Sequence, residues 1–249
     1  MSAAVRTPGR TATLATRPSS YVPGMRLVLA LSGGLVAWSF LANYGAGDTL
    51  YVTRNLVATA GLVLLARRVG LDRAALGLSR RHLGRGARWG GSSAAVIAVA
   101  VASGIALADV LDPVGRLLAD DRAALGAGGL AFALLVRIPL GTAVCEEVAF
   151  RGVLTAACRR VLPGPVAVGW SSLVFGLWHI APTAIALRIN DVDPTSPEGV
   201  ATVAGAVAVT TVAGVLFDLL RSRSRSLLAP VLAHWAVNAF SLAAAAATR

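Results

Sequence analysis

The segment Cys145-Glu146-Glu147-Val148-Ala149-Phe150-Arg151 sets two adjacent carboxylates and an arginine inside an apolar stretch. Apolar sequence flanks it on both sides, from Leu130 to Leu140 and from Val153 to Ala157. Ionisable side chains are costly at membrane depth, and by default they mark functional positions there. The stretch therefore predicts a membrane-spanning helix that carries a functional site.

The whole chain has the composition of a membrane protein. Hydrophobic residues make up 56% of its 249 residues and charged residues only 14%, whereas soluble domains carry about 25% charged residues. The sequence predicts an all-α, polytopic transmembrane bundle around a membrane-embedded polar cavity. We divide it into a disordered cytoplasmic tail at 1–24, N-terminal transmembrane helices at 25–126 and a core at 127–247. Seven spans of about 20 residues can be marked, at 25–43, 49–67, 88–111, 127–158, 165–183, 199–220 and 227–247.

The arginines predict the orientation of these spans. Sixteen of them fall before the first span or in the loops after the second, fourth and sixth, and five fall on the opposite side with eight acidic residues. Because positive loops stay in the cytoplasm, we expect a multi-pass plasma-membrane protein with a cytoplasmic N-terminus and an outer C-terminus. The arginines lie in short loops between apolar segments, which favours contact with the lipid bilayer over a nucleic-acid partner.

Two further spans bring polar side chains to the depth of the paired carboxylates. At about 1.5 Å of rise per residue, Glu146 lies ~18 Å from the cytoplasmic end of its span and His179 ~21 Å from the end of the next. In the last span His234 lies ~11 Å deep and Asn238 ~17 Å. Helices running in opposite directions therefore place these groups in one layer in the middle of the membrane.

The spacing within each helix refines this expectation. Glu147 and Arg151 are four residues apart, so they share a helix face and can pair. Glu146 points about 100° away from Glu147, toward a different partner. His234 and Asn238, also four residues apart, form one polar stripe.

Two prolines predict irregular backbone near these groups. Pro139 removes the helical hydrogen bond to the carbonyl of Leu135, and Pro230 acts in the same way near the start of the last span. Freed carbonyls at membrane depth need water or protein partners. Both prolines are therefore compatible with a wet cavity.

The residue types point to hydrolysis of an amide by either of two routes. A buried Glu146 can act as the general base for water, while the two histidines and Asn238 polarise a carbonyl and hold the oxyanion. Alternatively Glu146, His179 and His234 can bind a divalent metal ion that activates the water, and zinc is the ion we expect first. The sequence leaves both routes open.

The three pieces, in this order, resemble the CPBP family, which comprises the type II CAAX prenyl endopeptidases and the bacterial Abi proteins. Its motifs are matched by Glu146-Glu147-x-x-x-Arg151, Phe175-x-x-x-His179 and His234-x-x-x-Asn238, within about residues 127–247. The resemblance implies that the chain is an intramembrane endopeptidase. Many members of the family are called metalloproteases, and members commonly have eight spans.

Carried over by position, the resemblance gives each matched residue a role. Glu146 activates water, Glu147 and Arg151 order the site, and the remaining residues, His179, His234 and Asn238, complete the water or metal site. The expected substrate is a membrane peptide or protein. Two other functions compete: a non-proteolytic scaffold or bacteriocin-immunity protein, and a proton-coupled transporter, which would predict inverted repeats that the sequence lacks.

Overall fold

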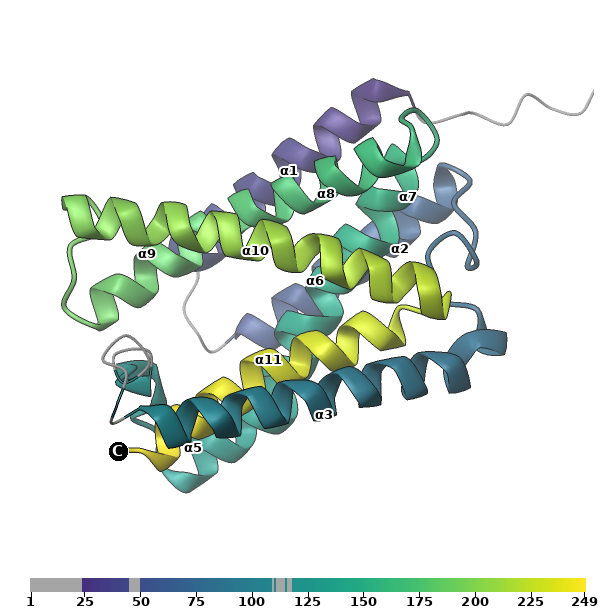
Figure 1. Ribbon diagram of the computed structural model, residues 1–249. Coiled ribbons are helices and arrows are strands. Elements are labelled where there is room, and N and C mark those ends of the chain that lie inside the picture. The colour runs from purple at the N-terminus through teal and green to yellow at the C-terminus, as the bar shows by residue number, and fades with distance from the viewer. Residues whose placement is uncertain (1–23, 45–49, 109, 111–114, 116–117) are drawn as a thin grey trace, which may run out of the picture.

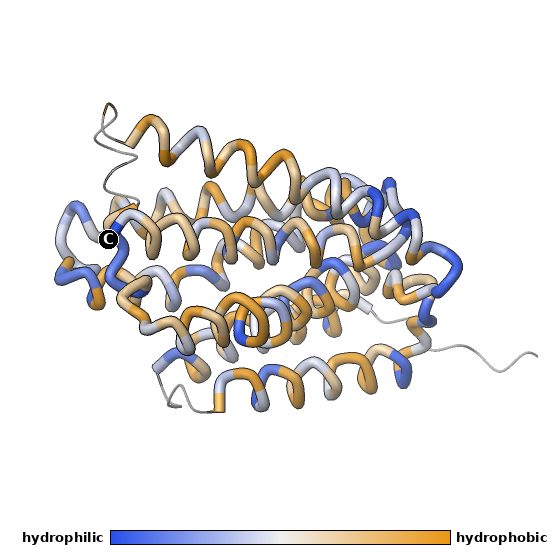
Figure 2. The backbone as a smooth tube through the Cα atoms, turned by 90° about the horizontal axis from the view of Figure 1, so that it is seen from below, coloured by the Kyte–Doolittle hydropathy of each residue, from blue (hydrophilic) through white to orange (hydrophobic). Residues whose placement is uncertain are grey.

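The computed structural model describes residues 24–44, 50–108, 110, 115 and 118–249, and within them every regular element is a helix. The predicted tail at 1–24 lies, except for Gly24, outside the described residues. The helices pack as a bundle (Figure 1), and Figure 2 shows hydrophilic residues gathered toward its two ends. The all-α transmembrane architecture predicted from the sequence is confirmed.

Six long helical segments of the described chain are apolar enough to cross a membrane. They are α1 (Met25–Tyr44), α3 (Leu83–Leu107) with the short helix η2 (Arg80–His82) before it, the long helix at 127–158, α8 (Gly164–Trp178) with α9 (Ile180–Ile189), α10 (Pro197–Ser224) and α11 (Leu228–Ala247). The seventh predicted span is α2 (Tyr51–Arg68), an 18-residue helix whose mean hydropathy is lower because Arg54 and Asn55 interrupt it. A short helix, η3 (Asp121–Ala123), precedes the long helix.

The long helix at 127–158 carries the paired carboxylates and is not a regular α-helix. It contains α5 (Ala127–Phe132), α6 (Cys145–Glu147) and α7 (Thr155–Cys158), separated by the π-helical segments η4 (Ala133–Val144) and η5 (Val148–Leu154). A π-helix has wider turns, and such segments are frequent at functional sites. Here they flank the three-residue α6 on both sides.

The other helices form two groups around this long helix, and the two groups contact each other through α10 and α11. In one group α8 packs against α1, α9 and α10; in the other α11 packs against α3 and η4 (Figure 1). The helix η4 also contacts α2, where Asn55 Nδ2 donates to the carbonyl of Gly141 at 2.9 Å. The core side chains of the bundle gather around η5, with Phe150, Leu154 and Phe175 among the most completely buried.

Two predicted spans have different bounds in the structure. The third span, predicted as 88–111, is α3, which begins at Leu83 and ends at Leu107. It begins earlier because the helix includes Arg85 and Arg88, which the hydropathy pattern assigned to a loop. The fifth, predicted as 165–183, breaks at His179 and continues as α9 to Ile189. The break coincides with Pro182, which has no N–H to continue the first helix.

Candidate active site

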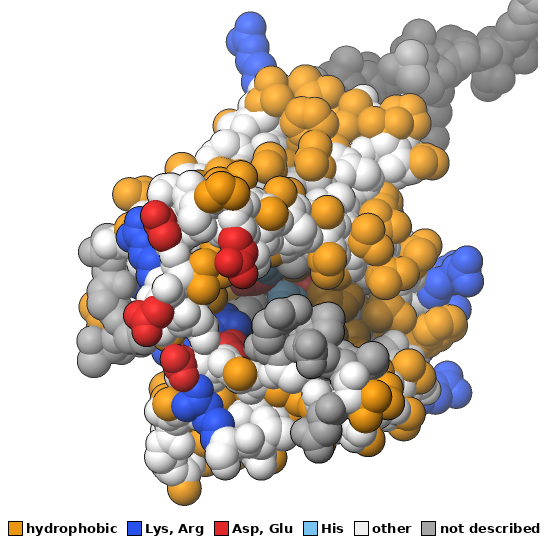
Figure 3. All heavy atoms as spheres, turned by 60° about the vertical axis from the view of Figure 1, so that its left-hand side comes forward, with side chains coloured by type: hydrophobic (Ala, Val, Ile, Leu, Met, Phe, Trp, Pro, Cys, Tyr) orange, Lys and Arg blue, Asp and Glu red, His pale blue; other side chains and the backbone are white. Residues whose placement is uncertain are grey.

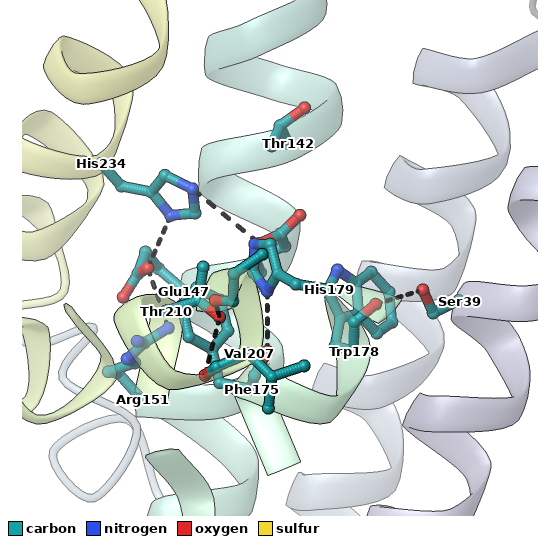
Figure 4. Close-up of polar contacts among 12 residues, drawn as sticks. Ser39, Thr142, Glu147, Arg151, Phe175, Trp178, His179, Val207, Thr210 and His234 are labelled. Carbon is teal, nitrogen blue, oxygen red and sulfur yellow. Dashed lines mark hydrogen bonds and ion pairs between the residues drawn. The ribbon is translucent and has the colours of Figure 1, made fainter. Parts of the chain in front are cut away.

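The site is built from α6, from the break between α8 and α9, and from α11. Glu146 and Glu147 lie on α6 and are 6% and 0% exposed, and His234 on α11 is 4% exposed. His179 occupies the single residue between α8 and α9, and its side chain is 20% exposed. Figure 4 shows the imidazole rings of His179 and His234 on the side of the helix that carries Glu147. The structure thus brings together Glu146, His179 and His234, which the sequence predicted to lie in one layer.

Glu147 is the fixed acceptor of the site. Its Oε1 accepts a hydrogen bond from Arg151 Nη1 at 3.1 Å and another from His234 Nδ1 at 2.8 Å. The pairing with Arg151 is the one predicted from the four-residue spacing. Because a carboxylate accepts, the shared proton lies on Nδ1 of His234, and a neutral ring keeps a lone pair on Nε2.

The carboxylate of Glu146 lies close to both histidines. Its Oε2 lies 3.8 Å from His234 Nε2 and 4.0 Å from His179 Nε2. This Oε2 is buried and has no hydrogen-bond partner among the described residues. Glu146 and Glu147 therefore share His234 as a neighbour, at different ring nitrogens, and only their second neighbours differ: His179 for Glu146 and Arg151 for Glu147.

The ring of His179 is oriented by its own helix end. Its Nδ1 lies 2.7 Å from the carbonyl oxygen of Phe175, and a carbonyl can only accept, so the proton is on Nδ1 here too. In the neutral ring Nε2 then carries a lone pair directed at Glu146. Three acceptors, two imidazole nitrogens and one carboxylate oxygen, thus meet with no hydrogen-bond donor of the described chain between them.

Such a group of acceptors needs a proton donor or a cation. A water molecule with hydrogen bonds of about 2.8 Å can bridge atoms 3.8 and 4.0 Å apart. Zinc holds its ligands at 2.0–2.1 Å, which in a tetrahedron separates them by roughly 3.4 Å. One carboxylate and two imidazoles are ligands that suit zinc. To bind it, the distances from Glu146 Oε2 to the two Nε2 atoms would have to shorten by a few tenths of an ångström. In the described chain, no group of three metal-ligating side chains already has the spacing of a metal site.

Aromatic rings enclose the charged groups. The guanidinium carbon of Arg151 lies 3.9 Å from the ring centre of Phe175 and 5.0 Å from that of Phe217. Phe217 also stacks on His234, with the ring centres 5.2 Å apart. The sequence analysis had quoted Phe175 as part of a motif but missed Phe217, which stands in an apolar stretch of α10 with no local signal.

Asn238 is the predicted site residue with the fewest contacts. It lies on α11 one turn beyond His234, is half-buried, and forms no side-chain hydrogen bond with another described residue. Its amide therefore keeps its hydrogen-bonding capacity. Figure 3 shows a hollow in the end of the bundle that carries the α9–α10 connection, with histidine and carboxylate atoms inside it.

Side chains from other helices support the irregular backbone around the site. In a π-helix the missing N–H of Pro139 leaves the carbonyl of Leu134, five residues earlier, without a partner. Trp235 Nε1 on α11 donates to that carbonyl at 3.0 Å. The sequence analysis had assumed α-helical bonding and named Leu135; the wider π turn shifts the affected carbonyl by one residue.

The other two prolines near the site differ from each other. Pro182 cannot donate to the carbonyl of Trp178, and Ser39 Oγ on α1 donates to it instead at 2.6 Å. Pro230 is the third residue of α11, where the N–H would have no partner within the helix in any case. The expectation that Pro230 disrupts its helix is therefore wrong.

Comparison with known proteins finds one family that part of the chain resembles. Residues 128–240 match the family described as Rce1-like, type II CAAX prenyl endopeptidase. This range contains all six predicted site residues and agrees with the CPBP membership predicted from the motifs. No curated protein and no solved structure was found to match the chain. Residues 128–240 of the chain are thus similar to the Rce1-like type II CAAX prenyl endopeptidases.

Proposed function

We propose that the chain hydrolyses a peptide bond of a membrane-associated peptide or protein, with Glu146 as the base that activates water. The observation that carries this proposal is the meeting of three acceptors, Glu146 Oε2 and the Nε2 atoms of His179 and His234, around one small space. A water held there donates to the carboxylate and to an imidazole at the same time. Its oxygen is then oriented and ready to lose a proton.

The bond changes follow from these positions. Glu146 takes a proton from the water as the oxygen attacks the carbonyl carbon of the scissile bond. The same carboxyl group then gives the proton to the amide nitrogen as the carbon–nitrogen bond breaks. Neutral histidines with Nδ1 already bonded can only accept at Nε2, so they hold the water, and the amide of Asn238 is the donor we assign to the oxyanion.

Glu147 and Arg151 act as positioning residues in this scheme. Glu147 fixes the tautomer and the ring plane of His234 through its 2.8 Å hydrogen bond, and Arg151 neutralises the Glu147 charge. Partners of this kind, one step removed from the reacting atoms, keep catalytic groups in place.

Glu146, His179 and His234 are also the residues that would hold a divalent metal, and zinc matches one carboxylate and two imidazoles. When bound, such an ion lowers the pKa of its water and polarises a carbonyl oxygen. The metal-assisted and metal-free routes use the same three side chains. Metal content, measured beside activity, separates them.

The test is cleavage of a membrane-peptide library, including prenylated CAAX peptides, by the purified protein in lipid nanodiscs. Wild type is compared with Glu146→Gln and Glu146→Ala, and the control is Glu198→Gln, which changes an exposed glutamate in the first turn of α10. We expect cleavage to be lost in both Glu146 variants and kept in the control.

Metal content is measured on the same preparations. Metal that is present in wild type and lost with Glu146→Ala would select the metal-assisted route, and full activity without metal would select the other. Folded Glu146 variants that cleave as well as wild type would refute the protease proposal. That result would favour a scaffold or immunity protein.

A further inference from the structure

A second cavity lies at the arginine-rich end of the bundle, apart from the hollow that shows histidine. It has a volume of about 450 Å³ and is formed where α7, the end of α10 and the α2–α3 connection meet. Its deepest residues, Leu71, Arg151 and Thr155, are buried, whereas the surrounding Ala74 and Ala75 are exposed. The cavity therefore has a buried floor and an open rim. Five arginines line it: Arg151, Arg159, Arg160, Arg221 and Arg225.

The charge of these arginines is only partly neutralised. Arg151 pairs with Glu147, and Arg159 Nη2 pairs with Asp218 at 2.9 Å. The other three, Arg160, Arg221 and Arg225, have no carboxylate within 4.0 Å in the described chain. The cavity therefore has an excess of positive charge, which favours an anionic ligand.

Main-chain contacts hold two of these arginines in position. Arg160 donates to the carbonyls of Val69 and Gly70, and Arg221 donates to those of Ala74 and Ala75. Both guanidinium groups are therefore fixed at the cavity wall. A charge that is already ordered loses little conformational entropy when a ligand binds.

Two arginines that line this cavity each carry a buried donor with no hydrogen-bond partner in the described chain. The donors are Nη2 of Arg151 and Nε of Arg221, on side chains whose residues are 2% and 8% exposed. A buried N–H without an acceptor is destabilising, so these two arginines keep unused hydrogen-bonding capacity.

We propose that this cavity binds a phosphate group. A phosphate presents several acceptor oxygens in different directions, which matches guanidinium groups arranged around one space. The cavity lies at one end of helices that are apolar enough to cross a membrane, and lipid head groups are found at the ends of such helices. The phosphate can belong to an anionic phospholipid or to a soluble phosphate compound.

The bound group would reach the catalytic centre through one side chain. Arg151 lines the cavity, and its Nη1 donates to Glu147, whose Oε1 also accepts from His234. The binding proposal itself does not depend on proteolysis.

The test uses the full chain and compares two variants in which one arginine is replaced by aspartate, one inside the cavity and one outside it. Arg225 lines the cavity, is exposed, and has a positive φ of 59°, which aspartate tolerates better than most residues. Arg225→Asp therefore changes the charge of the cavity with little backbone strain. The control is Arg223→Asp, two residues away and exposed at the same end of α10, but not part of the cavity.

Two arms distinguish the sources of phosphate. In the first, native mass spectrometry counts the lipids retained from nanodiscs of phosphatidylglycerol and of phosphatidylcholine. In the second, calorimetry follows titration of inorganic phosphate and glycerol phosphate into the detergent-solubilised protein. Thermal unfolding confirms that each variant is folded, and Arg225→Asn replaces Arg225→Asp if that variant is not.

We expect saturable binding in at least one arm, weakened about five- to tenfold by Arg225→Asp and less than about twofold by Arg223→Asp. Binding in the first arm alone identifies a lipid, and binding in the second identifies a soluble phosphate. Equal weakening by both variants would mean diffuse surface charge and would overturn the proposal. Absence of saturable binding in both arms would also overturn it.

Discussion

His234 is the residue on which the two carboxylates of α6 converge. Its Nδ1 is bonded to Glu147, and its Nε2 faces Glu146 at 3.8 Å. The buried ion pair of Glu147 with Arg151 thus does more than neutralise a charge: it decides which nitrogen of the ring carries the proton. Glu146 is left as the carboxylate that can exchange a proton with a substrate.

The acceptor group around Glu146 makes a prediction about stability. In Glu146→Gln the side chain keeps its size, and its new amide N–H can donate to the lone pair of His179 or His234. We expect a gain of about 1 kcal/mol in the free energy of unfolding, measured as a raised thermal midpoint in detergent.

Glu198→Gln is the control, because its glutamate is exposed, and it should leave the midpoint unchanged. A lower midpoint in Glu146→Gln would contradict the prediction. It would indicate instead that a cation bridges these residues in the wild-type protein.

At this scale the sequence predicted the pairs but not their surroundings. Helical spacing is a local rule, so it gave the Glu147–Arg151 contact. The stacking of Phe217 on His234 joins α10 to α11 and depends on how the helices pack. No local pattern reports such a contact.

At the scale of elements, the site depends on helices whose hydrogen bonding is interrupted by prolines and whose free carbonyls are bonded by side chains from other helices. Pro182 ends α8 at Trp178, and this break frees His179 to turn its Nδ1 back to the Phe175 carbonyl. The carbonyl of Trp178 is satisfied by Ser39 from α1. The break positions the imidazole without leaving that carbonyl unpaired in the membrane.

Ser39→Ala should destabilise this break. The substitution leaves the buried Trp178 carbonyl without a donor, at a cost of about 1–3 kcal/mol, and thermal unfolding in detergent measures it. The double variant Ser39→Ala with Pro182→Ala should recover much of the loss, because an alanine in place of the proline supplies the missing N–H.

Ser93→Ala is the matched control for this experiment. The hydroxyl of Ser93 is exposed and bonds the carbonyl of Trp89 within its own helix, so we expect little change. If Ser39→Ala were as mild as Ser93→Ala, the carbonyl of Trp178 would not depend on α1.

The hydropathy of the sequence predicts where the helices are, but it does not predict where their hydrogen-bonding pattern is irregular. The bounds of the helix at 127–158 were predicted correctly because its apolar stretch ends at arginines on one side and glycines on the other. Its π turns were missed because Pro139 signals an interruption without specifying the bonding pattern that replaces it. α9 was missed beyond residue 183 for a related reason, since its second half contains Arg188 and is less apolar.

At the scale of the whole molecule, α3 is attached to the bundle chiefly through α11. Only 6% of its most apolar window is buried, and the contact is made by small residues such as Gly86 and Gly90. A Cβ at Gly90 would lie 2.8 Å from Leu232 Cβ and 3.0 Å from the Ala229 carbonyl oxygen. Close approach of helices through small residues is typical of membrane proteins.

Gly90→Val should therefore loosen α3, with a cost of about 1–3 kcal/mol in thermal unfolding and faster proteolysis of the α2–α3 connection. Gly91→Val is the control, since a Cβ at Gly91 meets nothing within 4 Å. Both changes have the same helix propensity cost, so equal effects would show that packing against α11 is not the cause.

The orientation of the bundle in the membrane remains to be tested. We expect the arginine-rich end to be cytoplasmic. In variants with one added cysteine, expressed in bacteria, a membrane-impermeant maleimide should label Thr195→Cys on intact cells and Arg223→Cys only after permeabilisation. The native Cys145 and Cys158 are buried and should stay unlabelled. The reverse pattern would place the histidine-bearing hollow on the cytoplasmic side.

The repair of proline breaks by distant side chains also has an evolutionary consequence. Ser39 matters because residue 182 is proline, and Trp235 Nε1 matters because residue 139 is proline. In related sequences each proline and its donor should be gained or lost together, although 143 positions separate the first pair and 96 the second. Such linked substitutions would identify descendants of this architecture even where the rest of α1 and α11 has diverged.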